Sequence, residues 1–248
     1  MGYIVPENNT RIYVQTGMQT TPEDALKNAQ ALSQIVKEPV GVIVNGTQGL
    51  PKDVEEYLPK APTLKDALNE YTYQALNKND PSLIVLHSAG NEDAKKALQL
   101  GQQLGHQYNN LSFVSLASPV SNTTLQALTD NTNANYLGQV NDWRDPVTYS
   151  KIAGTTAVGS AATGLVSGGI YGATTGASLG ATAGAAGGPL GAIFLGAVGG
   201  AVGGAVGAIP GALGYYGLQT YHPFPNYIAK PQSQSIMFDW LKNNPQRK

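Results

Sequence analysis

The sequence reads SLIVLHS at Ser82–Ser88 and continues with the helical pattern NEDAKKALQLGQQLGHQ at Asn91–Gln107. Together these two segments indicate a strand followed by a helix. Four consecutive apolar side chains, from Leu83 to Leu86, are typical of a strand that is buried on both faces of a parallel sheet. A buried strand that leads at once into a helix is one unit of an alternating β/α domain.

The same alternation extends over the first 150 residues. Apolar runs predict further strands at Arg11–Gly17, Val40–Gly46, Leu111–Pro119 and Ala134–Trp143. Helical patterns lie between the runs, at Thr21–Val36, Thr63–Asn77 and Ser121–Thr129. Thr21 is the expected N-cap of the first helix, with Pro22 at its first position. Because crossovers between parallel strands are right-handed, we expect a three-layer α/β fold with a mostly parallel sheet of about five or more strands.

Charge and glycine are distributed very unevenly along the chain. The 248 residues carry 15 basic and 16 acidic side chains, yet residues 152–229 contain none of them. Of the 30 glycines, 21 lie within residues 152–217. We therefore predict a body made of residues 1–151 and 218–248, interrupted by an insert at residues 152–217.

The insert has the pattern of a glycine-zipper helical hairpin. Glycine recurs at every fourth residue from Gly164 to Gly188, and shorter series with the same spacing follow Gly196. On a helix this spacing gives a narrow face on which another backbone can pack closely, and this allows self-association of helices in lipid. The second half, residues 190–217, is longer than the ~20 apolar residues that span a bilayer. The side chains expected to contact lipid are Ile193, Phe194, Leu195, Val198, Val202 and Val206.

Other interpretations of this region stay open at the level of sequence. The insert could be a flexible low-complexity linker, or a set of helices that pack within a soluble oligomer. The aromatic residues after it fit either a membrane interface or core packing; they are Tyr215, Tyr216, Tyr221, Phe224 and Tyr227.

Composition excludes several classes of function. A net charge of −1 without a basic cluster argues against a nucleic-acid partner. The chain has no Cys, and its three His are scattered, so neither a metal site nor a cofactor is predicted. The start, MGYIVPENNTR, lacks the features of a Sec signal peptide. Export would therefore use another route, or the chain would be part of a longer one.

Ser88 lies on the predicted turn from strand to helix, within Leu86-His87-Ser88-Ala89-Gly90. This turn raises a serine hydroxyl at the carboxyl edge of the sheet. The segment resembles the nucleophile elbow of the α/β-hydrolase superfamily, Gly-x-Ser-x-Gly, and in particular its lipase-like branch. Leu86 departs from that pattern, because it replaces the first glycine.

The resemblance implies that an acid and then a base follow the nucleophile along the chain. Asp145, in an Asp-Pro-Val loop after the fifth apolar run, fits the acid, and Asp142 is the alternative. His222 fits the base. Asp145 and His222 are 77 residues apart, and subtracting the 66-residue insert leaves 11, a spacing similar to that of compact members of the superfamily.

By the same resemblance, Ser88 would be the nucleophile, His222 the general base and Asp145 its orienting acid. The oxyanion would be bound by the backbone N–H groups of Ala89 and Met18, with Gly17 providing room for the backbone. Among the other histidines, strand geometry predicts that His87 points away from the site. His106, near a helix end, is expected at the surface.

These features predict a serine hydrolase, a lipase or phospholipase that acts on membrane lipid through its apolar insert. The architecture is similar to that of bacterial lipase-type toxins and effectors. It implies membrane association, and secretion without a Sec signal or residence in the bacterial cytoplasm before delivery, with an immunity or delivery partner left unidentified. The alternative is a non-catalytic membrane-inserting or pore-forming protein that carries the hairpin on an α/β domain.

Overall fold

The computed structural model describes residues 10–17, 20–44, 62–78, 80–142, 145, 148 and 222–245. These described residues belong to one compact unit, to which both the early and the late parts of the chain contribute. The predicted insert at 152–217 lies outside them, together with Met18 and the six side chains expected to contact lipid. The hairpin and its membrane contact therefore stay predictions.

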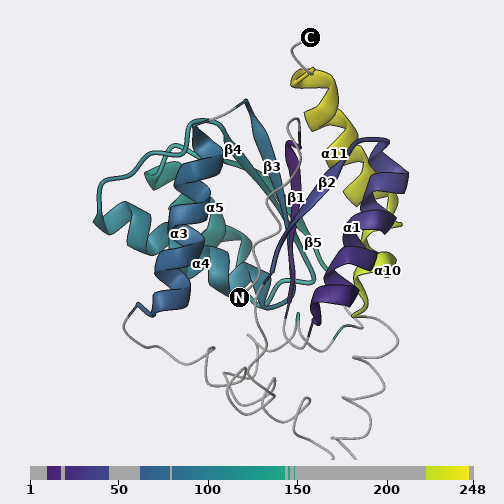
Figure 1. The fold of residues 1–248 in the computed structure, drawn as a ribbon, viewed down its shortest axis with the longest axis horizontal. Helices are drawn as coiled ribbons and strands as arrows, with labels where there is room; N and C mark the ends of the chain where they lie inside the picture. Colours follow the sequence, from purple (N-terminus) through teal and green to yellow (C-terminus); the bar gives the residue numbers. More distant parts are fainter. Residues whose placement is uncertain are drawn as a thin grey trace, which may run out of the picture. The chain divides into compact units, whose positions relative to one another are not determined.

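The core of this unit is a five-stranded, all-parallel sheet with the order β2-β1-β3-β4-β5 (Figure 1). The strands are β1 (Ile12–Gln15), β2 (Val40–Ile43), β3 (Ser82–His87), β4 (Leu111–Leu116) and β5 (Asn135–Val140). The central strand β3 pairs in register with both neighbours, with Leu83 opposite Ile12 on one side and opposite Ser112 on the other. The prediction of an α/β fold with a parallel sheet is confirmed.

Helices cover both faces of the sheet (Figure 1). They are α1 (Pro22–Val36), α3 (Leu64–Asn77), α4 (Gly90–Gln103), α5 (Asn122–Asn131), α10 (Phe224–Ile228) and α11 (Pro231–Asn243). Helices α3, α4 and α5 lie on one face, and α1, α10 and α11 lie on the other. The chain first moves outward from β1 to β2 and then crosses back to β3, so the direction of winding reverses between β1 and β3.

Side-chain caps fix where the first helices begin. The Thr21 hydroxyl accepts a hydrogen bond from the Asp24 N–H at 3.1 Å, which confirms the predicted N-cap of α1. Thr63 and Asp66 form a reciprocal capping box at the start of α3. Each cap satisfies backbone donors that a helix terminus leaves without an intrahelical partner.

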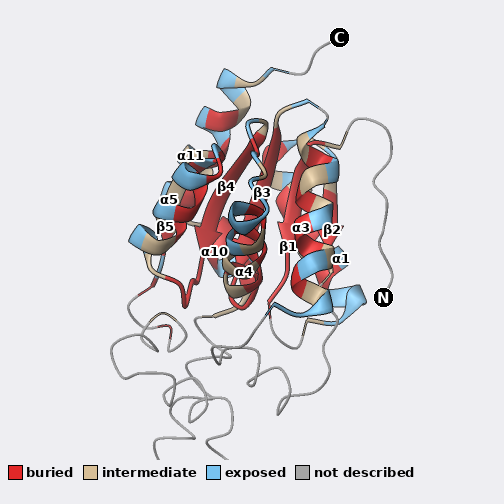
Figure 2. Ribbon diagram, turned by 90° about the vertical axis from the view of Figure 1, so that its left-hand side faces the viewer, coloured by how far each residue is buried: buried red, intermediate tan, exposed pale blue. Residues whose placement is uncertain are grey.

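Alternation along β3 divides the hydrophobic core into two parts. Ile84 and Leu86 pack with α3, α4 and α5, whereas Leu83 and Val85 pack with α1, α10 and α11. All four residues are fully buried, and Figure 2 shows the central strands of the sheet coloured as buried. Because side chains alternate between faces with a period of two, the last residue of the strand, His87, belongs on the α10 side.

Most of the strands are shorter than the apolar runs that predicted them, and two of the differing boundaries have a clear local cause. The helical pattern predicted to end at Gln107 ends at Gln103, where Gly105 adopts a positive φ of 74° and reverses the chain. The strand predicted to include Ser88 ends at His87, because Ser88 itself leaves the extended conformation.

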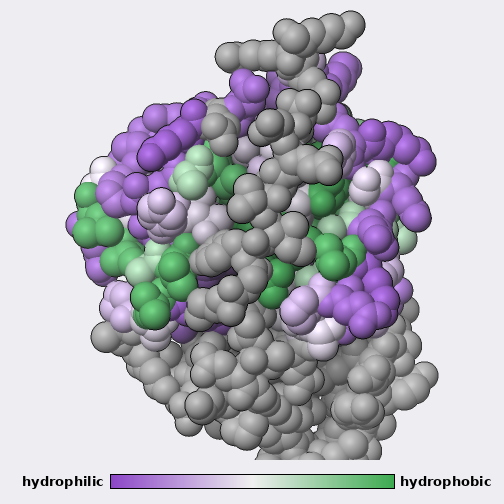
Figure 3. Space-filling model, viewed as in Figure 1, coloured by the Kyte–Doolittle hydropathy of each residue, from purple (hydrophilic) through white to green (hydrophobic). Residues whose placement is uncertain are grey.

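The surface of the described body mixes polar and apolar side chains. Figure 3 shows hydrophobic groups interspersed among hydrophilic ones on one face. Leu64 and Tyr71, both on α3, are the most exposed of the large apolar residues described, at 74% and 69%. None of the helices within the described residues combines the length and the hydropathy that a bilayer crossing requires.

Candidate active site

Ser88 occupies a strained turn between β3 and α4. Its φ is 55°, a left-handed conformation that costs an L-residue about 1–2 kcal/mol. The Asn91 side-chain amide donates to the Ser88 carbonyl at 3.0 Å and to the Leu116 carbonyl at 3.2 Å. Ser115 in turn donates to the Asn91 side-chain oxygen at 2.6 Å. This buried network ties the turn to β4 and helps to hold Ser88 in its strained conformation.

Two glycines make the close approach around Ser88 possible. A Cβ at Gly17 would lie 2.5 Å from the Ser88 Cβ and 3.0 Å from its Oγ. A Cβ at Gly90 would lie 2.5 Å from the Gln15 carbonyl oxygen. Leu86, which stands where the elbow pattern has glycine, is fully buried in the core beside α3, α4 and α5. The tight contacts therefore lie at Gly17 and Gly90, and the core accommodates the side chain of Leu86.

His222 and Asp145 meet directly although they are 77 residues apart. The His222 Nδ1 lies 2.7 Å from the Asp145 Oδ2. Asp145 is completely buried and is held as well by the Tyr227 hydroxyl, which donates to the same oxygen at 2.6 Å. A carboxylate that accepts from Nδ1 fixes the imidazole tautomer and leaves Nε2 as the basic nitrogen.

Asp142, the alternative acid, has a different set of partners. Its carboxylate forms an ion pair with the Lys230 Nζ at 2.8 Å, and its backbone N–H donates to the Tyr227 hydroxyl at 3.2 Å. These contacts favour Asp145 over Asp142 as the partner of the imidazole.

The His87 ring lies against His222, which corrects the expectation that this neighbour of Ser88 points away from the site. The two ring centroids are 4.9 Å apart with an interplanar angle of 31°. The His87 Nε2 is 2.9 Å from the His222 backbone carbonyl oxygen. Burial, together with the nearby His222, lowers the pKa of His87 to about 3. The face of β3 that carries Leu83 and Val85 also carries His87, and α10 brings His222 to that face.

His106 belongs to a separate cluster. Its Nδ1 lies 2.7 Å from the buried Glu70 carboxylate, which also accepts from Tyr108 and Gln74. Burial raises the pKa of Glu70, but these three hydrogen bonds outweigh burial and lower it. His106 follows α4 and precedes β4, so it lies toward the amino ends of the strands, away from Ser88.

Of the residues expected to form the oxyanion site, the structure describes Ala89 and Gly17. Ala89 directly follows Ser88 and is the N-cap of α4, without a side-chain hydrogen bond at that cap. Gly17 is buried against Ser88, and Met18 lies outside the described residues. The N-terminus of a 14-residue helix therefore begins immediately after the serine, where its dipole favours negative charge.

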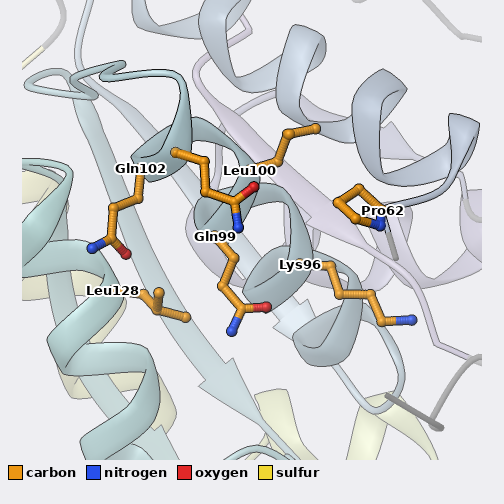
Figure 4. A pocket seen from close by; sticks show the side chains of 7 residues that line it. Pro62, Lys96, Gln99, Leu100, Gln102 and Leu128 are labelled. Atoms are coloured by element: carbon orange, nitrogen blue, oxygen red, sulfur yellow. The ribbon is translucent and has the colours of Figure 1, made fainter. Parts of the chain in front are cut away.

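A surface pocket elsewhere is formed by α4 and its neighbours (Figure 4). Lys96, Gln99, Leu100, Gln102 and Gln103 line it from α4, with Pro62 and Leu128 on either side. It contains none of the predicted site residues. Within the described residues, no group of three or more His, Asp or Glu side chains could hold a metal ion.

Comparison of the chain with protein families, with characterised proteins and with solved structures gives no match. What the fold and site define is therefore a parallel α/β domain in which a strained serine and a His–Asp pair lie at the carboxyl end of the sheet.

Proposed function

We propose that this chain is a serine hydrolase of carboxylic esters in lipids, a lipase or phospholipase built on an α/β-hydrolase-like body. The observation that carries the proposal is the 2.7 Å contact between His222 and Asp145. His222 in turn lies against His87, the residue directly before the strained Ser88. Ser88, His222 and Asp145 would thus supply a nucleophile, a base and an orienting carboxylate at the carboxyl edge of the sheet.

The order of these residues in the fold also supports the proposal. Ser88 follows β3, Asp145 follows β5, and His222 comes last, which is the order expected of α/β-hydrolases. The site lies beyond the carboxyl ends of the strands, beside the reversal between β1 and β3, where open parallel sheets bind their ligands.

In the proposed reaction, the His222 Nε2 removes the proton of the Ser88 hydroxyl as Oγ attacks the ester carbonyl carbon. The C–O π electrons move to the carbonyl oxygen, and they return as the bond to the alcohol breaks. His222 gives its proton to the departing alcohol, which leaves an acyl group on Ser88. A water molecule then repeats the sequence, releases the fatty acid and restores the serine.

Two features of the site suit this chemistry. Asp145 stabilises the imidazolium that forms when His222 takes up a proton, and Tyr227 holds the carboxylate in place. The Ala89 N–H at the start of α4, with a second N–H after Gly17, would donate to the developing oxyanion.

The lipid part of the proposal is supported by the sequence of the insert. Residues 152–217 join the segment of the acid to the segment of the base, and they contain no charge. An apolar hairpin at that point in the chain would bring the catalytic edge to a bilayer, where lipid esters are located.

The test uses the full-length chain with two substrates and one covalent probe. We expect hydrolysis of p-nitrophenyl butyrate, release of fatty acid from phosphatidylcholine–phosphatidylglycerol vesicles, and labelling of Ser88 by a fluorophosphonate. Ser88→Ala should abolish all three. Ser82→Ala is the matched control, because Ser82 is buried at the opposite end of the same strand and should leave all three intact.

A further variant separates ester hydrolysis from action on membranes. Replacement of residues 152–217 by a short Gly-Ser linker should preserve hydrolysis of p-nitrophenyl butyrate and abolish release of fatty acid from vesicles. Full activity of Ser88→Ala would overturn the serine mechanism. Dye leakage from vesicles that survives Ser88→Ala but not the deletion would favour the pore-forming alternative.

A further inference from the structure

The environment of His87 assigns a proton to one of its nitrogens. The His87 Nε2 lies 2.9 Å from the backbone carbonyl oxygen of His222. Because a carbonyl oxygen can only accept, Nε2 must carry the hydrogen and donate it. His87 is 6% exposed, so water competes little for this hydrogen bond.

The same ring also packs against the imidazole of His222, with 4.9 Å between centroids. Phe224 contacts His87 edge-on at 5.4 Å, and Tyr227 does so at 6.0 Å. His87 is thus fixed from the strand side by β3 and from the other side by the segment that carries His222. The contact restrains both the backbone and the ring of His222.

Charge matters in this arrangement because His222 becomes an imidazolium during the proposed reaction. A second cation stacked 4.9 Å away would oppose that change. With its pKa lowered to about 3 by burial and by the proximity of His222, His87 stays neutral at physiological pH. It can therefore hold His222 closely without adding electrostatic repulsion.

We propose that His87 is a positioning residue for the base: its Nε2–H and its ring hold His222 in the orientation that Asp145 and Ser88 require. This inference rests on the proposed function, because it concerns the reaction of Ser88. It also accounts for a histidine directly before the nucleophile, since that position ends β3 on the face covered by α10.

The test compares two substitutions at His87 in the full-length chain. His87→Phe keeps an aromatic ring but removes the donor, whereas His87→Gln keeps an N–H donor near the position of Nε2. With p-nitrophenyl butyrate, we expect His87→Phe to lower kcat about tenfold with little change in KM, as for the loss of one orienting hydrogen bond. His87→Gln should stay within about threefold of wild type. His106→Phe, the same change at the histidine outside the site, should leave kcat unchanged.

A second readout reports on the base itself. The proton between the His222 Nδ1 and Asp145 should give a downfield NMR signal in the wild type and in His87→Gln. In His87→Phe the signal should broaden or shift as the ring loses its restraint, while circular dichroism shows an intact fold. Equal kcat and an unchanged signal in an active, folded His87→Phe would overturn the positioning role alone. An inactive wild type that the fluorophosphonate does not label would instead overturn the proposed function.

Discussion

Tyr227→Phe removes a single buried hydroxyl from the site and leaves the aromatic ring. Tyr227 is fully buried, and its hydroxyl donates to the Asp145 Oδ2 at 2.6 Å. The oxygen of the Tyr227 hydroxyl in turn accepts from the Asp142 backbone N–H at 3.2 Å. Phenylalanine would keep the packing of the ring against His87 and beneath Lys230, whose Nζ is 5.2 Å from the ring centroid. The change therefore isolates the two hydrogen bonds of the hydroxyl.

The expected loss follows from the kind of hydrogen bond removed. A hydrogen bond to an ionised acceptor contributes about 1.5–3 kcal/mol, and the Asp142 N–H would also lose its partner. We expect the free energy of unfolding to fall by about 2 kcal/mol. If the transition state of the proposed reaction loses about 1.4 kcal/mol of stabilisation, kcat/KM falls about tenfold. If it loses the full value of about 3 kcal/mol, kcat/KM falls roughly 150-fold.

Urea unfolding and the rate of p-nitrophenyl butyrate hydrolysis measure the two effects separately. Tyr71→Phe is the control, because Tyr71 is 69% exposed and should change neither quantity. A Tyr227→Phe protein with unchanged stability and unchanged kcat/KM would refute the claim that this hydroxyl secures the Asp145 carboxylate. A loss of stability with unchanged kcat/KM would limit Tyr227 to a structural role.

Other variants probe the turn and the buried histidine. Ser88→Gly should abolish hydrolysis. It should also have a free energy of unfolding about 1 kcal/mol higher than Ser88→Ala, because glycine adopts a φ of 55° without strain. Equal stability of the two variants in denaturant unfolding would contradict the strained turn. Gly90→Ala should lower stability by about 1–3 kcal/mol, because its Cβ would lie 2.5 Å from the Gln15 carbonyl oxygen; an unchanged urea midpoint would show that α4 can move away freely. His87 binds its proton with a pKa of about 3 in the folded protein and near 6.5 when unfolded, so the stability it contributes is present above pH 6.5 and is lost as the pH falls toward 3. Unfolding measured across this range should show a slope from His87 of up to about 1.4 kcal/mol per pH unit, and His87→Gln should remove that part of the slope.

The sequence predicts the class of fold because most of the strands contain runs of apolar residues. Leu83 to Leu86 form such a run, and caps such as Thr21 mark where the following helices begin. Strand order does not follow from the same pattern. Whether a new strand joins beside β1 or beside β3 depends on packing between elements, and the apolar runs are the same in either arrangement.

The geometry of the candidate site follows from the sequence where local structure determines it and less well where tertiary packing does. Ser88 can be chosen as a candidate nucleophile because the strand, the turn and the helix around it are adjacent in sequence. The spacing between Asp145 and His222 also suggested a pair. The proximity of His87 to His222 was missed, because the alternation along β3 gives its face but not the helix that covers that face. The aromatic pattern after the insert allowed core packing for Tyr227, which is observed, but it gave no sign of the hydrogen bond to Asp145.

The hydrogen bond between Asp145 and His222 also has a consequence for the length of the chain. The two residues flank the long apolar segment, so this 2.7 Å contact closes a loop whose ends lie 77 positions apart in the sequence. Because the entropy cost of closing a loop grows only slowly with its length, the body can carry so long a segment between these two residues at little extra cost in stability. The length of that segment can therefore change widely without a large effect on the pairing of the imidazole and the carboxylate.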